Sequence, residues 1–201
     1  LVTYGKQVND LSELNGEQVY FPFEGSPIEE VTTFLVKQQG ADLVPVYLPF
    51  ESSIELLKQG SARAVILPEP NVTLVEGQPN VYISLSLFDL WNQQTHTDAG
   101  YPQVASFVNP DWAKEHAEEI NQFNQALSEA IVFVQQNPEE AVKEVQEYYK
   151  LPAEKLLTSV NRTQYNLSSG SEMQMVIEDY YQTIGKPLDE NLSDFYFISA
   201  Q

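Results

Sequence analysis

The sequence predicts an α/β protein in which a lobe built on a parallel-rich sheet with flanking helices is followed by a mostly helical region. Over the first half of the chain, apolar runs alternate with amphipathic helical segments, as they do in parallel βαβ units. After about residue 100 the apolar spacing becomes almost entirely helical, with prolines and polar turns between the segments. A hydrophobic content of 42% in 201 residues allows one large core or two smaller ones.

The first half of the chain contains the strands and helices of the predicted sheet. A polar turn and a short helix come first, at residues 8–16. Four apolar runs then predict strands, at residues 18–23, 43–49, 62–68 and 81–87. The segments 27–40 and 51–60 predict the connecting helices, since their apolar side chains fall on one face and each segment ends in glycine.

The second half of the chain is predicted to be nearly all helix. Helical spacing extends over residues 110–137, 138–150, 152–162 and 171–185. Each segment begins with proline or serine and carries acidic residues in its first turn, where the helix dipole favours negative charge. The segment YPQVASFV, residues 101–108, precedes them and is a candidate for one further strand.

Composition excludes several classes of function. The 29 acidic residues against 10 basic ones give a formal charge of −19, which argues against binding nucleic acid or anionic membrane through a broad positive face. Cysteine is absent, so disulfides, thiol nucleophiles and cysteine metal sites are excluded. His96 and His116 have no metal-ligand neighbour at helical spacing, and neither a metal nor a catalytic group is expected. No run approaches the roughly 20 apolar residues of a membrane span, and LVTYGKQVND does not read as a signal peptide.

Five phrases in order over nearly the whole chain resemble the solute-binding proteins of bacterial ABC importers, in the nitrate/sulfonate/taurine and thiamine-precursor (NMT1/THI5-like) group. They are LSELNGEQVYFPFEGSP, LLKQGSARAVILPEP, GYPQVASFVNPDWAKEHAEEINQFNQAL, FVQQNPEEAVKEVQEYYKLPAEKL and EDYYQTIGKPL. The chain departs from the group at Arg63, where the group usually has Asp. Members of the group also begin with roughly another hundred residues. The resemblance therefore implies that the N-terminal part is lacking, as in a fragment, a proteolysed product or an unusual short form.

The resemblance implies a type II periplasmic-binding-protein fold, in which two α/β lobes close over a ligand by hinge motion. Residues 10–102 are expected to form the α/β ligand-binding lobe. Residues 1–9 and 103–201 are expected to form hinge strands and the helical remainder of a second, incomplete lobe, with hinges near Leu1–Gly5 and Gln103–Val108. The ligand is expected at the carboxyl ends of the strands, where open α/β sheets bind ligands.

The stretch FPFEGSPIEE contains the first candidate ligand contacts. Ser26 as N-cap, Pro27 at the first helical position and Glu29 at the third fit a capping box, so this turn reads as a helix start. The alternative keeps the cap and adds the backbone N–H groups of Gly25 and Ser26 as ligand donors. The resemblance adds support to that alternative, because it places the turn at the ligand cleft, and both readings stay open.

Aromatic residues and one carboxylate complete the candidate site. Phe23, Phe50 and Tyr101 lie at strand ends or in a turn, where they could stack on a planar or cationic ligand, although most aromatic residues belong to cores. Glu69 follows the third strand, at the Glu-Pro that the resemblance places near the cleft. It could accept a hydrogen bond from a ligand amine or amide, or it could cap a turn.

The charges near these loops bear on the sign of the ligand. Glu24, Glu29 and Glu30 crowd the helix start, and the other two predicted loops hold Glu51 and Glu69 but no basic residue. The chain has only two arginines, at positions 63 and 162, and a buried oxyanion usually requires arginine or several convergent donors. We therefore expect a neutral or cationic organic solute, such as a thiamine precursor or an amine, in preference to an inorganic anion.

The resemblance implies an extracytoplasmic protein, in the periplasm or as a cell-surface lipoprotein, that delivers a small solute to an ABC permease. Its only link to the membrane is expected to be a lipid anchor absent from this chain, and no cofactor is expected. One alternative is an enzyme on the same fold, related to pyrimidine synthases or menaquinone-pathway dehydratases. Against it, the chain has no cysteine, no clustered histidine and no nucleophile–base pair. Another alternative is a sensor or interaction domain.

Overall fold

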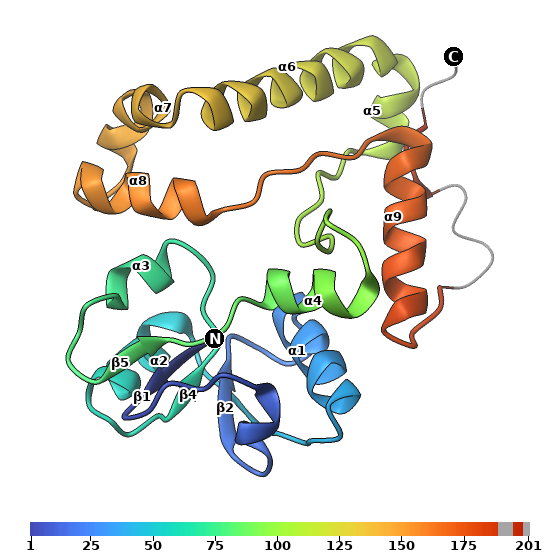
Figure 1. Ribbon diagram of the computed structural model, residues 1–201. Coiled ribbons are helices and arrows are strands. Elements are labelled where there is room, and N and C mark those ends of the chain that lie inside the picture. Colours follow the sequence, from blue (N-terminus) through green and yellow to red (C-terminus); the bar gives the residue numbers. More distant parts are fainter. Residues whose placement is uncertain (189–194, 199–201) are drawn as a thin grey trace. The chain divides into compact units, whose positions relative to one another are not determined.

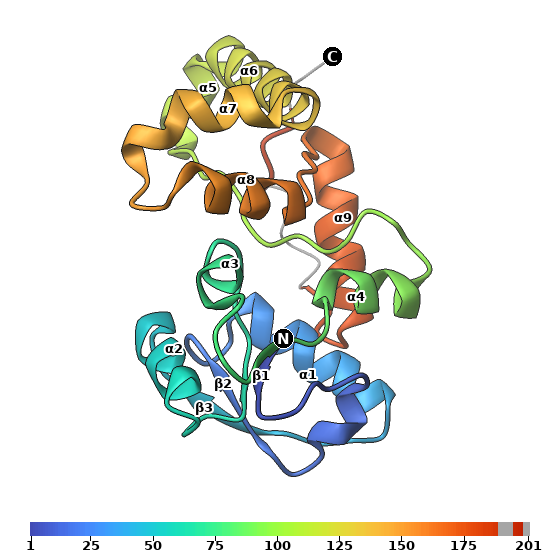
Figure 2. The ribbon, with the colours of Figure 1, turned by 60° about the vertical axis from the view of Figure 1, so that its left-hand side comes forward.

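The computed structural model describes residues 1–188 and 195–198, and its contacts divide the chain into two compact units. Unit 1 consists of Leu1–Gly100 together with Glu154–Arg162. Unit 2 consists of Tyr101–Ala153 and the described residues from Thr163 onward. Figures 1 and 2 together label the helices and strands of the two units, which are described separately below.

A mixed five-stranded sheet forms the centre of unit 1. Its strands are β1 (Val2–Tyr4), β2 (Gln18–Phe21), β3 (Val44–Tyr47), β4 (Ala64–Val65) and β5 (Val81–Ile83), in the order β3-β2-β4-β1-β5. β2 pairs in parallel with both β3 and β4, whereas β1 pairs antiparallel with β4 and β5. The predicted α/β class and parallel-rich sheet are confirmed, and the segment expected as a hinge strand supplies the one antiparallel strand of this sheet.

The strands are shorter than the apolar runs that predict them. β2 ends before Pro22, and β3 tolerates Pro45 because it lies at the edge of the sheet, where a missing N–H breaks no ladder on the open side. The run 62–68 pairs over two residues only. The strand expected over 81–87 is wrong beyond Ile83, because Ser86 caps a helix by accepting a hydrogen bond from the Asp89 N–H at 3.2 Å.

Helices cover both faces of this sheet. The helices of unit 1 are α1 (Pro27–Gln38), α2 (Phe50–Lys58), α3 (Asn71–Val75), α4 (Leu87–Thr95) and α8 (Ala153–Arg162), together with a 3-10 turn η1 at Leu11–Leu14. Figure 2 shows α1 and α2 on opposite sides of the strands. The two connecting helices and the short helix η1 are confirmed, whereas α3 and α4 were not expected from the sequence. α4 packs on α1, where the Trp91 and Phe34 rings lie 5.5 Å apart.

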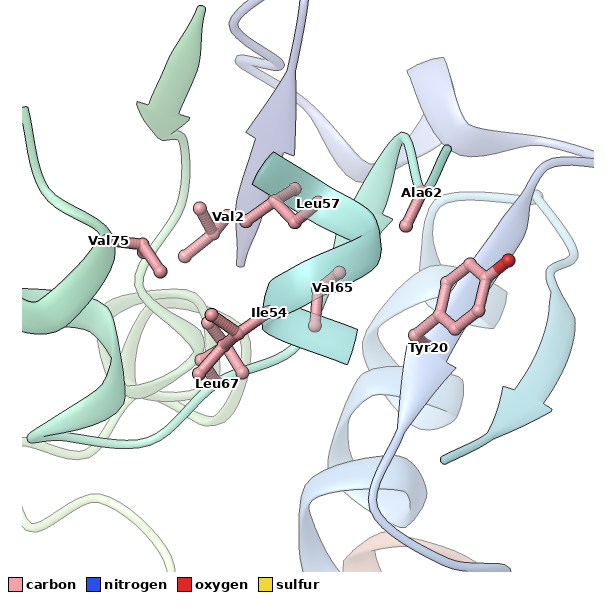
Figure 3. Packing of buried hydrophobic residues seen from close by; sticks show 8 residues of the cluster. All are labelled: Val2, Tyr20, Ile54, Leu57, Ala62, Val65, Leu67 and Val75. Atoms are coloured by element: carbon pink, nitrogen blue, oxygen red, sulfur yellow. The ribbon is translucent and has the colours of Figure 1, made fainter. Parts of the chain in front are cut away.

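One apolar cluster fills the space between α2 and the sheet (Figure 3). Its members are Val2, Tyr20, Ile54, Leu57, Ala62, Val65, Leu67 and Val75. Side chains alternate between the two faces of a strand, so Tyr20 points toward α2 while its neighbours Val19 and Phe21 point toward α1. Burial on both faces explains why these runs are apolar without alternation.

Unit 2 is helical in the part of the chain that the structure describes. It contains α5 (Pro110–Glu115), α6 (Ala117–Gln136), α7 (Pro138–Val145), the 3-10 turn η2 (Gln146–Tyr148) and α9 (Gly170–Thr183). The single helix expected over 110–137 is wrong, since His116 leaves the helical conformation (φ −127°, ψ 34°) and separates α5 from α6. The other expected helices of this half are present, although the segment 138–150 continues from α7 into η2.

The candidate strand at residues 101–108 does not form. Val104 and Phe107 in this segment are 93% and 80% exposed. A strand requires a neighbour to pair with its N–H and C=O groups, and unit 2 offers none among its described residues. In the same unit, α6 buries none of its 20 residues although apolar side chains cover a wide arc of it. Exposure of this kind fits the incomplete second lobe that the sequence implies.

The compact units and the expected lobe boundaries differ in three places, one of them being residues 101–102, which lie in unit 2. Residues 1–9 lie in unit 1 because β1 pairs between β4 and β5, and residues 154–162 join it as α8. Which residues move together as a lobe therefore stays a prediction.

Candidate functional site

Three loops lie at one edge of the sheet in unit 1. The parallel strands β3, β2 and β4 are neighbours, so their carboxyl ends meet at the same edge. Five of the expected ligand contacts follow these ends: Phe23, Gly25 and Ser26 after β2, Phe50 after β3, and Glu69 after β4. The structure thus brings these loops to the edge where α/β sheets hold ligands. Tyr101 belongs to unit 2 and is described with that unit.

The turn after β2 is a helix start with a modified capping box. The Ser26 Oγ accepts a hydrogen bond from the Glu29 N–H at 3.3 Å, which confirms Ser26 as the N-cap of α1. The Glu29 carboxylate reaches back one residue further than in the usual box, and its Oε2 accepts from the Gly25 N–H at 2.6 Å. Gly25 has φ +72°, a conformation that a side chain would strain. Its N–H, one of the two expected ligand donors, is therefore already bonded within the chain.

Glu29 also connects this turn to the next strand. Its Oε1 accepts a hydrogen bond from the Tyr47 hydroxyl at 2.7 Å, and Tyr47 is the last residue of β3. That bond raises the pKa of Tyr47 to about 12, because the phenol proton is held by a carboxylate. One side chain therefore fixes the ends of both β2 and β3.

The two aromatic candidates in unit 1 differ in exposure. Phe23 is 59% exposed and is free to meet a flat ligand. Phe50 is the first residue of α2 and is partly buried against the cluster of Figure 3. Phe23 is thus the better placed of the two for stacking, and both remain predicted contacts.

Glu69 caps a helix that the sequence did not predict. Its Oε2 accepts hydrogen bonds from the Thr73 backbone N–H at 3.2 Å and from the Thr73 hydroxyl at 2.7 Å. Its Oε1 lies 3.6 Å from Nη1 of Arg162, and the side chain is only 14% exposed. The turn-capping role is therefore present in the structure, and a contact with a ligand amine stays a prediction.

Two basic residues of α8 contact the loop that begins at Glu69. Arg162 forms an ion pair with Glu76, which lowers the pKa of the Glu76 carboxyl. Lys155 Nζ donates to the carbonyl oxygens of Thr73 at 3.1 Å and of Glu76 at 3.5 Å, at the end of α3, where carbonyls lack helical partners. Sequence reasoning missed these contacts because the partners are about eighty residues apart and no local spacing indicates them.

The other arginine is paired at the opposite edge of the sheet. Arg63 forms an ion pair with Glu17. Each residue comes directly before its strand, β4 and β2 respectively, so the pair lies at the amino ends of the parallel strands. Both arginines of the chain are thus paired with carboxylates of unit 1.

A shallow hollow of about 160 Å³ adjoins the Glu29 contacts. It lies between α1 and the β3 side of the sheet and was not expected from the sequence. Its lining residues are Phe21, Glu29, Thr33, Val36, Lys37, Asp42, Leu43 and Pro45. Glu29 is shared by the hollow and the turn, so any molecule entering the hollow meets the same carboxylate.

In unit 2, Tyr101 is half-buried, and burial raises its pKa to about 12. The His116 ring stacks on Trp112 at 4.2 Å, and its Nδ1 lies 2.9 Å from the Glu119 carboxylate. Within the described ranges no group of three or more His, Asp or Glu side chains could hold a metal ion. No helix in those ranges is both long and apolar enough to cross a membrane.

Loops gathered at the carboxyl ends of parallel strands lie where open α/β sheets hold ligands, and comparison with known proteins gives the family. The model of the NMT1/THI5 like family matches residues 1–141, which is more than half of the chain. The chain therefore belongs to the NMT1/THI5-like family. No curated protein sequence matches the chain.

Solved structures with the same fold include three binding proteins or transporters. The periplasmic aliphatic sulphonate binding protein SsuA from Escherichia coli has a TM-score of 0.73 at 16% identity, over 100% of this chain and 65% of that one. An ABC transporter protein from Parabacteroides distasonis has a TM-score of 0.72 at 16% identity, over 99% and 70%. The alkanesulfonate-binding protein SsuA from Xanthomonas axonopodis pv. citri, bound to MOPS, has a TM-score of 0.67 at 13% identity, over 94% and 65%.

These matches confirm the expected periplasmic-binding-protein fold. The chain spans about two thirds of the length of these proteins, 65% for the Escherichia coli protein, which agrees with an incomplete lobe. Identities of 13–16% show the fold alone, so the ligands of these proteins are not transferred to this chain.

Proposed function

We propose that the protein is the extracytoplasmic solute-binding component of an ABC importer. The observation that carries the proposal is the gathering of the loops after β2, β3 and β4 at one edge of the sheet, in a chain of the NMT1/THI5-like family. The similarity to periplasmic binding proteins supports a small-molecule ligand and a permease partner. The ligand is held between two lobes that close by hinge motion, and no covalent step is involved.

The ligand we propose is a neutral or cationic organic solute, such as a thiamine precursor or an amine. Both arginines are already paired with carboxylates, and the loops at this edge carry Glu24, Glu29 and Glu69. An anion there meets negative charge without a free guanidinium to offset it. The exposed ring of Phe23 supports stacking on a flat or cationic group, with Phe50 and Tyr101 as further aromatic contacts.

Delivery to a permease implies a location outside the cytoplasm. We include in the proposal that the protein is attached to the membrane as a lipoprotein. An enzyme on the same fold is the alternative, because the NMT1/THI5-like family includes enzymes.

A thermal-shift screen tests the ligand class. The chain is mixed separately with a pyrimidine thiamine precursor, small amines, alkanesulfonates and nitrate at equal ionic strength. A solute present at 100 times its Kd stabilises the folded state by about 2.7 kcal/mol, so we expect a clear rise in Tm with a precursor or an amine. Stabilisation by nitrate or a sulfonate alone contradicts the proposed ligand class.

A mutation and a product analysis complete the test. Phe23→Ala is expected to weaken binding about fivefold or more, since loss of a cation–π or stacking contact costs about 1 kcal/mol. Phe123→Ala, which changes a ring of similar exposure on α6, outside the proposed loops and hinges, is the control. Mass spectrometry of the ligand after incubation separates the alternatives: a receptor returns the solute unchanged, whereas an enzyme converts it.

A further inference from the structure

The helix start at Gly25–Ser26 is closed by a carboxylate of its own helix. The N-terminus of a helix offers unpaired N–H groups and a positive dipole end, which together suit an anion. In this chain the Glu29 Oε2 already accepts the Gly25 N–H at 2.6 Å. A charge-assisted bond of this length is among the stronger ones in proteins. An incoming anion has to displace that carboxylate before it can use the same donor.

A second contact holds the carboxylate in this place. Its other oxygen, Oε1, accepts the Tyr47 hydroxyl at 2.7 Å, so both oxygens of Glu29 are bonded at once. The bond is also reflected in the raised pKa of Tyr47. The backbone of Glu29 is fixed as well, since its N–H donates to the Ser26 Oγ at 3.3 Å. With the main chain and both carboxylate oxygens held, rotation of the Glu29 side chain away from Gly25 breaks both carboxylate hydrogen bonds.

The charges around the turn act in the same direction. Glu24 directly precedes Gly25 in the sequence, and Glu30 directly follows Glu29. The basic residue of α1, Lys37, lies in the last turn of the helix. Lys37 lines the hollow beside Glu29, and Asp42 lines it as well. The hollow therefore has one positive side chain, Lys37, and two negative ones, Glu29 and Asp42. The surroundings therefore do not neutralise the Glu29 carboxylate.

We propose that Glu29 determines specificity at this site by occupying, from within the chain, the backbone donor that an anionic solute needs. The role of Glu29 in transport rests on the proposed function. It adds to that function the residue that selects against anions. The exposed Phe23 ring remains accessible to neutral and cationic groups.

NMR titration of the protein with sodium methanesulfonate, at constant ionic strength, tests the proposal. In the wild-type chain we expect no saturable shift of the Gly25 and Ser26 amides. In Glu29→Gln the side chain keeps its size but loses its charge, so the remaining amide oxygen is a weaker acceptor for the Gly25 N–H and is displaced more easily by an anion. We expect a saturable shift with at least about a tenfold gain in affinity. Glu24→Gln is the control, because it removes the same charge from the same turn but makes none of the Glu29 contacts, and we expect no comparable gain.

A second variant tests the proposal independently in case Glu29→Gln does not fold. Tyr47→Phe keeps the Glu29 charge and removes one of its two anchors, and we expect a smaller gain in the same direction. The proposal is overturned if the wild type binds methanesulfonate at Gly25 as tightly as Glu29→Gln, if Glu24→Gln gains as much, or if neither variant gains.

The results separate this proposal from the proposed function. Gain of methanesulfonate binding by Glu29→Gln in a protein that binds no solute in the thermal screen supports the role of Glu29 and counts against the importer function. If the wild type binds an amine and neither variant gains affinity for methanesulfonate, the importer function is supported and the proposed role of Glu29 is wrong.

Discussion

Buried or half-buried carboxylates at the strand ends of unit 1 are each satisfied by named donors. Glu69 is 14% exposed and has the Thr73 N–H, the Thr73 hydroxyl and Arg162 beside it. Glu29 has the Gly25 N–H and the Tyr47 hydroxyl. A carboxylate removed from water is tolerated only with such partners. These residues therefore shape the loops of the candidate site whether or not they touch a ligand.

At the same scale, the packing of α2 depends on Leu57. This side chain is fully buried in the cluster of Figure 3. We expect Leu57→Ala to lower the free energy of unfolding by about 2–5 kcal/mol, because the lost burial and the remaining cavity add. Urea unfolding followed by circular dichroism measures the change.

Leu74→Ala is the matched control for that substitution. Leu74 lies in α3 and is 44% exposed, so the change is expected to stay within about 0.5 kcal/mol. Equal losses for the two variants would show that Leu57 is not in a closely packed core.

At the scale of elements, α8 is held on α3 by charge as much as by apolar packing. Lys155 bonds the carbonyls at the end of α3, and Arg162 pairs with Glu76 and lies beside Glu69. Leu156 supplies a buried apolar contact in the same helix. The segments of the chain on both sides of α8 belong to unit 2, whereas residues Glu154–Arg162 belong to unit 1.

Acid is expected to weaken the attachment of α8. The Arg162 guanidinium holds the pKa of the Glu76 carboxyl below its usual value, so the pair contributes its full stability above the ordinary glutamate pKa of about 4.3. That contribution is lost as the pH falls through the lowered pKa of the folded state. The protection of α8 amides against hydrogen exchange, corrected for the intrinsic pH dependence of the exchange rate, is expected to fall below about pH 4.

Arg162→Gln provides the comparison for this pH dependence. It removes the partner of Glu76, so α8 is expected to exchange faster near neutral pH and to change less on acidification. Lys58→Gln, which removes a basic residue paired with Glu55 on α2, is the control. An unchanged pH profile in Arg162→Gln would assign the attachment of α8 to apolar packing alone.

At the scale of the whole molecule, the two units differ in how much they bury. Unit 1 encloses the sheet between helices and contains most of the fully buried side chains. In unit 2, α6 buries no residue, and Val104, Phe107 and Tyr148 are 93%, 80% and 76% exposed. Elements with few buried contacts open at a low free energy.

Hydrogen exchange measured by mass spectrometry is expected to separate the two units. Amides of β2 and β4 should exchange slowly, and those of α6 should exchange at least about tenfold faster, since burial sets the free energy of opening. Equal protection of α6 and β2 would mean that the apolar arc of α6 is covered in solution.

Much of the fold was predictable because its signals are local. The capping box at Ser26 predicts the start of α1, and apolar spacing predicts both α1 and α2, and the structure confirms these helices. A glycine follows the end of each helix, as predicted. α4 carried a comparable signal in Ser86 and Asp89, which was masked by the apolar run of the preceding strand. The break at His116 and the unpaired segment 101–108 have no such signal, because they depend on neighbours in space.

The candidate site was predictable only in outline. Strand order places Phe23, Phe50 and Glu69 at one edge, as the βαβ pattern implies. The hydrogen bonds of Glu29 to Gly25 and Tyr47, and those of Glu69 to Thr73, were not predictable at this detail. They depend on the rotamer of one side chain and on the position of a neighbouring strand or turn.

The sequence by itself determined the α/β class, most helix starts and ends, and the resemblance to ABC importer binding proteins. Apolar periodicity, capping residues and short motifs all depend on residues that are close together in the sequence. Only the tertiary structure decided that β1 joins the sheet antiparallel, that α8 attaches to α3, and that the Gly25 donor is occupied by Glu29. These features arise from contacts between segments or from the direction of a single side chain. Their free energy depends on distance in space, which spacing along the chain does not specify.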